Sequence, residues 1–157
     1  MKVEELMTRK VTTCGQNDTL QRAAKSMWDG DCGSLPVCDD AQHVVGMITD
    51  RDICMAAQFE GKALNELPVH SSMAKKVLIC NPEQDISTVE KAMREAQVRR
   101  VPVVDNQGVL VGIVGLADFA REAASDRAAA EKDVTESEVG DTLAAICEPR
   151  VKPRRAA

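Results

Sequence analysis

Two stretches of the sequence carry the same pattern and decide the fold: SLPVCDDAQHVVGMITDRDI at residues 34–53 and RVPVVDNQGVLVGIVGLADF at residues 100–119. Each runs from an apolar-Pro-Val segment through a polar turn to a Gly-apolar-apolar segment, and then to an Asp near its end. The two Asp residues, Asp52 and Asp118, lie 66 positions apart, and this offset aligns the stretches without a gap. The first copy has Thr49 where the second has Gly115, so the second lacks one hydroxyl group.

The same offset also aligns the flanking sequence on both sides. Identical residues coincide along the chain: Val3 with Val69, Met7 with Met73, Cys14 with Cys80, and Met27 with Met93. Self-similarity at a fixed spacing is typical of tandem structural repeats. We therefore predict one repeat over residues 1–61, a second over 68–124, and a helical extension with a basic tail over 125–157.

Each repeat predicts the element order β-α-β-β-α. A short β-prone segment, 10–14 or 76–80, leads through a polar turn into an amphipathic helix. Two strands joined by a hairpin turn follow, and a second helix begins at Asp50 or Leu116. One such unit has too small a core to fold well alone. We expect an α/β fold in which the repeats pack sheet against sheet around a pseudo-two-fold axis, leaving two related clefts between them.

The apolar faces of the predicted helices follow helical spacing. The first helix of each repeat gives two matching sets: Leu20, Ala23, Ala24 and Met27, and then Ile86, Val89, Ala92, Met93 and Ala96. In the extension, a shorter amphipathic helix is predicted with Val139, Leu143 and Ile146 on one face. We expect this helix to dock on the repeats or on a second chain.

The composition excludes several function classes. A net charge of -5 argues against a broad nucleic-acid-binding surface. No apolar run is long enough for a membrane span or resembles a signal peptide, so we expect a cytoplasmic protein. The six cysteines form no C-x-x-C pair and the two histidines are isolated, which predicts no metal site. Reduced thiols that pack as small apolar residues are favoured over a redox role.

The doubled pattern resembles a pair of CBS domains (cystathionine-β-synthase domains), also called a Bateman module, and the resemblance covers residues 3–124. It implies an α/β disc with clefts that bind adenosine-containing ligands such as AMP, ADP, ATP or S-adenosylmethionine. It also implies a regulatory protein rather than an enzyme, and the pairing of two modules into a homodimer. Val89, Met93 and Ala96 are the apolar positions that we expect such a homodimer to bury.

Thr49 and Asp52 allow two interpretations. Thr-x-x-Asp after a strand is close to a capping box, which would explain both residues without any ligand. Alternatively, the N–H groups of the helix start suit a phosphate, and a carboxylate in the first turn suits the hydroxyls of a ribose. The resemblance assigns Thr49 to ligand oxygens, Asp52 to the ribose and Met47 to the adenine side.

The two clefts are not expected to be equivalent. Gly115 can begin a helix but offers no hydroxyl to a ligand, so the site of Asp118 would be weak. Arg99 and Arg100 precede the middle strand of the second repeat, where the first has Gly33 and Ser34. The resemblance implies that Arg100 reaches the phosphates of the ligand at Asp52, whereas Asp118 would face Ser34. It also places Cys32 and Gly33 beside the adenine.

The leading hypothesis is a stand-alone regulatory module that binds AMP, ADP or ATP and acts on an unidentified protein partner. The first alternative is an S-adenosylmethionine sensor of the same fold, which would not need Arg100. The second is a structural or redox-responsive interaction protein with an empty cleft. We find no nucleophile–base set and no phosphate-binding Gly-rich loop, so the sequence does not predict an enzyme.

Overall fold

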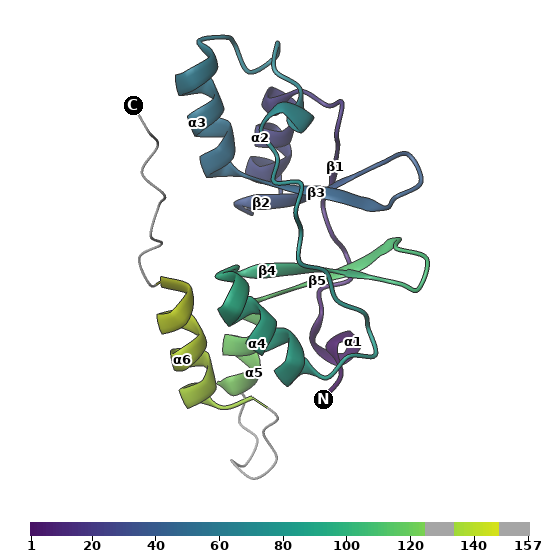
Figure 1. The fold of residues 1–157 in the computed structure, drawn as a ribbon, viewed down its shortest axis with the longest axis vertical. Coiled ribbons are helices and arrows are strands. Elements are labelled where there is room, and N and C mark those ends of the chain that lie inside the picture. The colour runs from purple at the N-terminus through teal and green to yellow at the C-terminus, as the bar shows by residue number, and fades with distance from the viewer. Residues whose placement is uncertain (125–133, 148–157) are drawn as a thin grey trace.

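The computed structural model describes residues 1–124 and 134–147, and the predicted basic tail lies outside them. Figure 1 shows two α/β halves stacked on each other, with their sheets facing at the centre and their helices on the outer sides. This is the predicted disc of two repeats. Within the described residues, no helix is both long and apolar enough to cross a membrane.

The first repeat forms a three-stranded sheet in the order β1-β2-β3, with β1 at Cys14–Gly15, β2 at Ser34–Cys38 and β3 at Val44–Thr49. β2 is parallel to β1 and antiparallel to β3. Two helices cover this sheet, α2 at Leu20–Asp29 and α3 at Asp50–Glu60. The order is the predicted β-α-β-β-α, although the first strand has only two residues.

The second repeat matches the first. Its hairpin pairs β4, Arg100–Val104, with β5, Leu110–Gly115, and its helices are α4 at Ile86–Ala96 and α5 at Leu116–Ala123. The strand predicted over 76–80 is reduced to a single bridge between Cys80 and Val103. This bridge corresponds to the pair of Cys14 with Val37 in β1.

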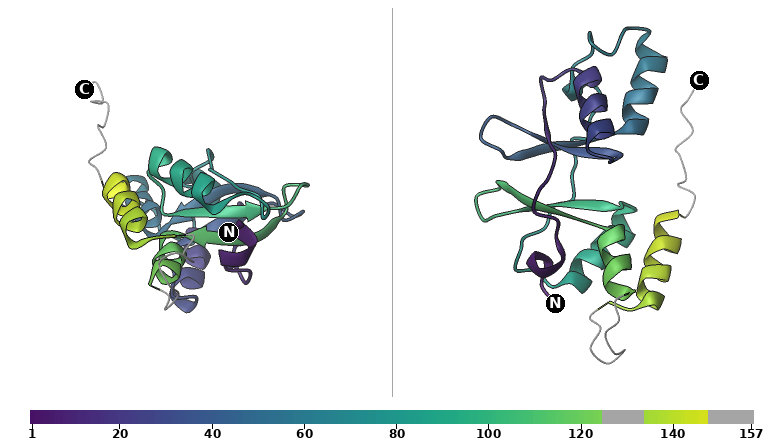
Figure 2. Two further views of the ribbon diagram at one scale, coloured as in Figure 1. Left: turned by 90° about the horizontal axis from the view of Figure 1, so that it is seen from below. Right: turned by 180° about the vertical axis from the view of Figure 1, so that it is seen from behind.

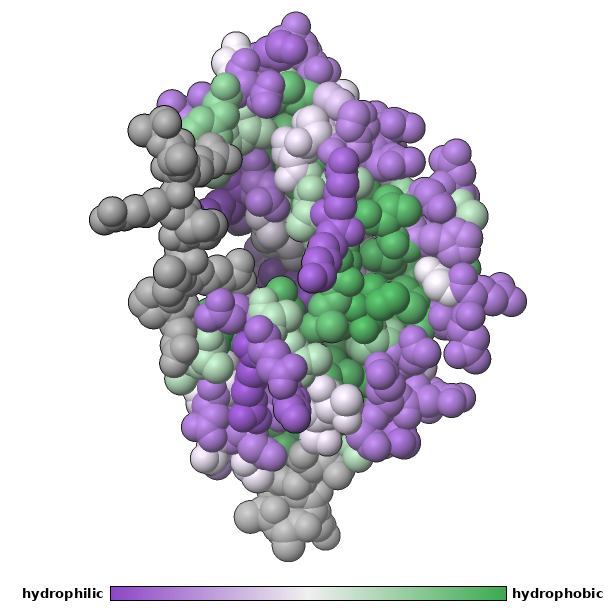
Figure 3. All heavy atoms as spheres, viewed as in Figure 1, coloured by the Kyte–Doolittle hydropathy of each residue, from purple (hydrophilic) through white to green (hydrophobic). Residues whose placement is uncertain are grey.

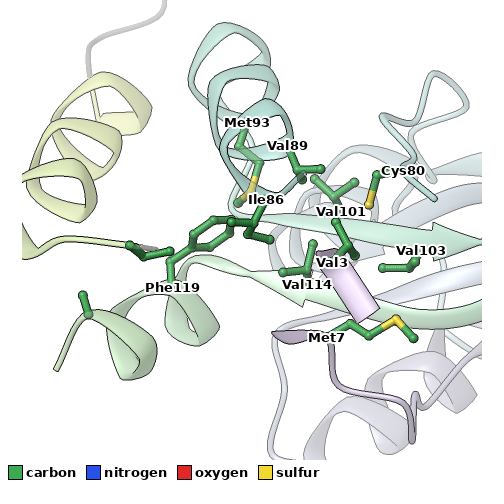
Figure 4. Packing of buried hydrophobic residues seen from close by; sticks show 12 residues of the cluster. Val3, Met7, Cys80, Ile86, Val89, Met93, Val101, Val103, Val114 and Phe119 are labelled. Atoms are coloured by element: carbon green, nitrogen blue, oxygen red, sulfur yellow. The ribbon is translucent and has the colours of Figure 1, made fainter. Parts of the chain in front are cut away.

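Each repeat places its first segment on the other repeat. The N-terminal helix α1, Val3–Leu6, packs in the core of the second repeat, which Figure 4 shows with Val3 and Met7 among its members. The short 3₁₀ helix η1, Val69–Ser71, packs in the core of the first repeat. Because each core contains a segment of the other repeat, core packing as well as the covalent linker holds the two repeats together.

In each of these crossed contacts, a methionine of one repeat packs directly on a glycine of the other. A β-carbon at Gly46 would lie 2.6 Å from the sulfur of Met73, and one at Gly112 would lie 2.6 Å from the sulfur of Met7. The aligned Gly and Met pairs of the sequence are thus a packing requirement. The absent β-carbon lets each thioether lie directly on a strand of the other repeat.

The helix α4 corrects one sequence expectation. Val89 and Met93, expected at a subunit interface, are 3% and 0% exposed because they pack in the core of their own repeat. Figure 4 shows Met93 turned toward Phe119 in that core. Ala96, the third of these residues, is exposed. The apolar face of α4 is therefore already buried in a single chain.

The predicted helix of the extension is present as α6, Glu136–Cys147, and it packs on α4 and α5. The views in Figure 2 place it along the outer side of the second repeat. Its buried residues are Thr142 and Ile146, with Val139 partly buried, whereas Leu143 is 47% exposed. Two of the three predicted inward residues are therefore confirmed. The third, Leu143, was wrong, because its neighbour Thr142 faces inward instead.

Thr142 is buried because it has a polar partner on α4. Its hydroxyl donates a hydrogen bond to the carboxylate of Glu90, which is 3% exposed. Arg94 pairs with the same carboxylate at 3.1 Å. A buried carboxylate of this kind is tolerated only when donors surround it.

We expect Thr142→Val to lower the free energy of unfolding by about 1 kcal/mol, because it removes one donor from Glu90 at nearly constant volume. Chemical denaturation of the two proteins measures this difference. Thr142→Ser, which keeps the hydroxyl, should lose less. An equal loss in both variants would mean that the methyl group, rather than the hydroxyl, holds α6.

Candidate ligand-binding cleft

A pocket of about 420 Å³ lies where the first repeat meets the second. In the space-filling view, the surface is hollowed between the two halves beside α3 (Figure 3). Residues of α2, of the turn before β2 and of the first turn of α3 line this pocket together with one residue of the second repeat: Ala24, Met27, Trp28, Asp31, Cys32, Gly33, Asp50, Ile53 and Arg100.

Three of the predicted site residues, Cys32, Gly33 and Arg100, line this pocket. Thr49 and Asp52 are not among its lining residues, although the lining residue Asp50 lies between them in the sequence, and Arg100 connects to Thr49 through Ser34. Met47 and Arg99 are not among the lining residues. Gly33 makes the close approach that we expected of a glycine, but to protein: a β-carbon there would lie 3.1 Å from Oδ2 of Asp50.

Thr49 and Asp52 form the capping box that the sequence allowed. The Asp52 N–H donates to Oγ1 of Thr49 at 3.1 Å, and the Thr49 N–H donates to Oδ2 of Asp52 at 2.9 Å. The Thr49 hydroxyl also donates to Oδ2, at 2.7 Å. Within the described residues, no hydrogen bond reaches Oδ1 of Asp52. One carboxylate oxygen of Asp52 therefore holds the cap.

The helix start itself is less available than we expected. The N–H of Asp50 donates to the carbonyl of Gly33 at 3.1 Å, and the N–H of Arg51 donates to the side chain of Asp50 at 2.7 Å. With the Asp52 N–H on Thr49, these donors of the first turn already have partners. The expectation that they would hold a phosphate is therefore not supported, and the nearby cation becomes the better candidate.

Arg100 supplies that cation. It begins β4, yet its guanidinium donates to the hydroxyl of Ser34 at 3.2 Å, so a residue of the second repeat reaches the first. Ser34 pairs in register with Thr49, which places Arg100 next to the capping box. No carboxylate in the described part of the chain pairs with Arg100. Ser34, which we expected to face Asp118, belongs instead with Arg100 and Thr49.

Asp118 has the equivalent position in the second repeat but different partners. It is 7% exposed, accepts the N–H of Gly115 at 2.7 Å, and pairs with the guanidinium of Arg121. In the first repeat, the residue aligned with Arg121 is Met55. The second carboxylate is thus satisfied by an internal cation that the first lacks.

Sequence reasoning missed Trp28, Asp31, Asp50 and Ile53 as lining residues. Trp28 carried a usable signal, because a single Trp at a position aligned with Arg94 is unusual in a chain so poor in aromatic residues. The other three offered none, since Asp and Ile at a helix start or in a turn are common without any ligand.

Cys14 and Cys80, two of the three buried cysteines, are core residues. Burial raises the pKa of both Cys14 and Cys80 to about 12, so each stays a neutral thiol near pH 7. This agrees with their interpretation as small apolar residues. The described residues contain no group of three or more His, Cys, Asp or Glu side chains that could hold a metal ion.

Comparison with known proteins identifies the repeats. The CBS-domain profile matches residues 3–58 and again 66–125. The CBS domain-containing protein YhcV of Bacillus subtilis is 35% identical over 127 residues, which are 81% of this chain and 89% of that protein. Hypoxic response protein 1 of Mycobacterium tuberculosis is 37% identical over 117 residues, covering 74% and 81% of the two chains.

Solved structures agree on the fold. A crystal structure of Hypoxic Response Protein I with two coordinated zinc ions has a TM-score of 0.70 and 36% identity, covering 77% of this chain and 98% of that one. The CBS domain pair of protein MJ0100 was solved with 5′-methylthioadenosine and S-adenosyl-L-methionine; it has a TM-score of 0.70 and 26% identity, covering 77% and 94%. With both repeats matched in sequence and in structure, this chain belongs to the CBS-domain family as a tandem pair of CBS domains.

Proposed function

We propose that this protein is a regulatory module that binds one adenine nucleotide, AMP, ADP or ATP, in the cleft of Thr49, Asp52 and Arg100. The observation that carries the proposal is the availability of two opposite charges at one place. Oδ1 of Asp52 has no partner among the described residues, and Arg100 holds only the hydroxyl of Ser34. The matching carboxylate of the second repeat, Asp118, is already paired with Arg121.

Each group has a chemical role in this proposal. Oδ1 of Asp52 accepts hydrogen bonds from ribose hydroxyls, as an acidic residue does in dinucleotide sites. The guanidinium of Arg100 binds phosphate oxygens, for which its planar fork of donors is well suited. The pocket beside them offers the aliphatic walls of Ala24, Met27 and Ile53 to the base. Cys32 and Gly33 complete this wall.

Regulation requires that the ligand bind two states of the protein with different affinities. The cleft joins both repeats, because Arg100 comes from the second and Asp52 from the first. A ligand held by both residues would favour one relative placement of the repeats. We propose that an unidentified protein partner reads this placement.

The main alternative is a ligand without phosphate, such as S-adenosylmethionine, which the domain pair of MJ0100 contains together with 5′-methylthioadenosine. Titration calorimetry with AMP, ATP, adenosine and S-adenosylmethionine discriminates these ligands. We expect AMP or ATP to bind more tightly than adenosine, at one site per chain. Tighter binding of S-adenosylmethionine would replace the proposal, and no binding of any of the four would favour an interaction protein with an empty cleft.

We also propose a homodimer, with a different face from the one that the sequence suggested. The groove between α4 and α5 already holds α6, whereas the matching side of the first repeat exposes two large apolar residues. Trp28 is 87% exposed and Phe59 is 76% exposed. Exposed aromatic groups of this size favour association.

Because Trp28 is the only Trp of the chain and also lines the pocket, its fluorescence reports on this face when it is measured without nucleotide. We expect the emission to shift to longer wavelength on dilution, as the dimer separates and the indole meets water. Light scattering should find a dimer at micromolar concentration, and Trp28→Glu should reduce it to a monomer. A dimer that persists in Trp28→Glu with an unchanged mass would place the interface elsewhere.

A further inference from the structure

Gly115 and Arg100 face each other across the hairpin of the second repeat. The strand register pairs Arg100 with Gly115, and it pairs the aligned residues Ser34 and Thr49 in the first repeat. In the first repeat, two short side chains, Ser34 and Thr49, thus face each other. In the second repeat, the long side chain of Arg100 faces a glycine. Directly opposed residues of antiparallel strands have β-carbons only about 5 Å apart, so their sizes are coupled.

The space at Gly115 is taken by its neighbours. A β-carbon built there would lie 3.3 Å from Cγ of Arg100 and 3.2 Å from the carbonyl oxygen of Arg99. That carbonyl is held in place, because it accepts the N–H of Leu116 at 2.9 Å. The backbone itself does not require glycine, since its φ of -139° is one that any residue adopts.

We propose that Gly115 is a positioning residue for Arg100. Its missing side chain leaves room for the aliphatic stem of Arg100, which passes over β5 and delivers the guanidinium to Ser34 in the other repeat. The second copy thus lacks a hydroxyl at position 115 because the space is needed by Arg100, which reaches the cleft of the first copy. For ligand binding, this inference rests on the proposed function, whereas the contact between Arg100 and Ser34 does not depend on it.

The environment of Asp118 agrees with this assignment. Its carboxylate accepts the Gly115 N–H and pairs with Arg121, so it does not draw the guanidinium of Arg100 back to the second repeat. Arg100 is left free to cross to the first repeat. A Thr at position 115 would both occupy the space of the stem and bring a hydroxyl back to Asp118.

The first test measures AMP and adenosine binding to Gly115→Thr, Gly115→Ala, Arg100→Ala and the double variant Gly115→Thr with Arg100→Ala. We expect Gly115→Thr to weaken AMP by about tenfold with little change for adenosine, and the double variant to be no weaker than Arg100→Ala. Gly140→Ala is the matched control, because nothing lies within 4 Å of a β-carbon there. Equal weakening of AMP and adenosine, or additive losses in the double variant, would overturn the proposal.

The second test needs no ligand and therefore separates this proposal from the proposed function. Ser34→Ala is compared in the wild type, in Gly115→Ala and in Gly115→Thr by the midpoint of urea unfolding. If Gly115 positions Arg100, removal of the Ser34 hydroxyl lowers the midpoint in the wild type but less or not at all in the two Gly115 variants. The same decrease in all three backgrounds would refute the positioning role even if the cleft binds nucleotides.

Discussion

Asp52→Ala is expected to remove tight binding of AMP and to leave a folded protein. The variant loses the carboxylate oxygen that is proposed to accept the ribose hydroxyls, and hydrogen bonds to a charged group contribute about 1.5–3 kcal/mol each. Even one such bond and part of a second correspond to an affinity lower by about a hundredfold. Titration calorimetry measures this change. Loss of the capping contact to Thr49 should cost only about 0.5–2 kcal/mol of stability.

Asp118→Ala is the internal control for this experiment. Its carboxylate is buried and holds Arg121 and the N–H of Gly115, so the variant should lose stability while its affinity for AMP stays nearly unchanged. The pair Asp52→Asn and Asp118→Asn removes only the charge and tests the same asymmetry with less disturbance. Greater loss of AMP binding in Asp118→Ala than in Asp52→Ala, or two equal sites per chain in the wild type, would contradict the proposed asymmetry.

Arg100→Ala is expected to weaken AMP and ATP by about ten- to a hundredfold and adenosine far less. The guanidinium has no acidic partner within the described residues, so its charge is available to a phosphate, and such a contact contributes about 1.5–3 kcal/mol. Arg100→Lys should recover part of the loss, because it keeps the charge but not the planar fork of donors.

A charge-matched control excludes a general electrostatic effect of the substitution. Lys91 lies on α4 with its side chain 78% exposed, and its one ion-pair partner among residues 1–124 and 134–147 is Glu95. Lys91→Ala removes the same charge and should leave AMP binding unchanged. If Arg100→Ala weakens adenosine as much as AMP, Arg100 supports the junction of the repeats rather than a phosphate.

The face formed by α2 and α3 differs in polarity from the matching face of the second repeat. On α4, Glu90 and Arg94 hold the docked helix α6 through Thr142, whereas the aligned residues on α2 are Ala24 and Trp28. The first repeat therefore has no polar anchor for such a helix, and it presents an apolar surface with a pocket instead. This difference distinguishes the two otherwise similar faces.

Much of the fold followed from the sequence alone. The offset of 66 residues, the Gly-apolar-apolar segments and the helix starts at Asp50 and Leu116 predicted two β-α-β-β-α units. Both are present, except that the first strand of the second unit is reduced to the bridge of Cys80 with Val103. Such features are local, because strand alternation, turn residues and helix capping depend on neighbours within a few positions. The capping box of Thr49 and Asp52 belongs to the same class, and its geometry matches one of the two interpretations.

The tertiary structure decided which of these side chains lie together. The pairing of Asp118 with Arg121 is a contact within one turn of α5, whereas the contact of Arg100 with Ser34 joins residues 66 positions apart. Whether Val89 and Met93 face a partner depends on the core against which α4 packs. The reach of Arg100 depends on empty space at Gly115. The sequence determines the elements because their causes are short-range, whereas the site arises from contacts between the repeats that no local pattern records.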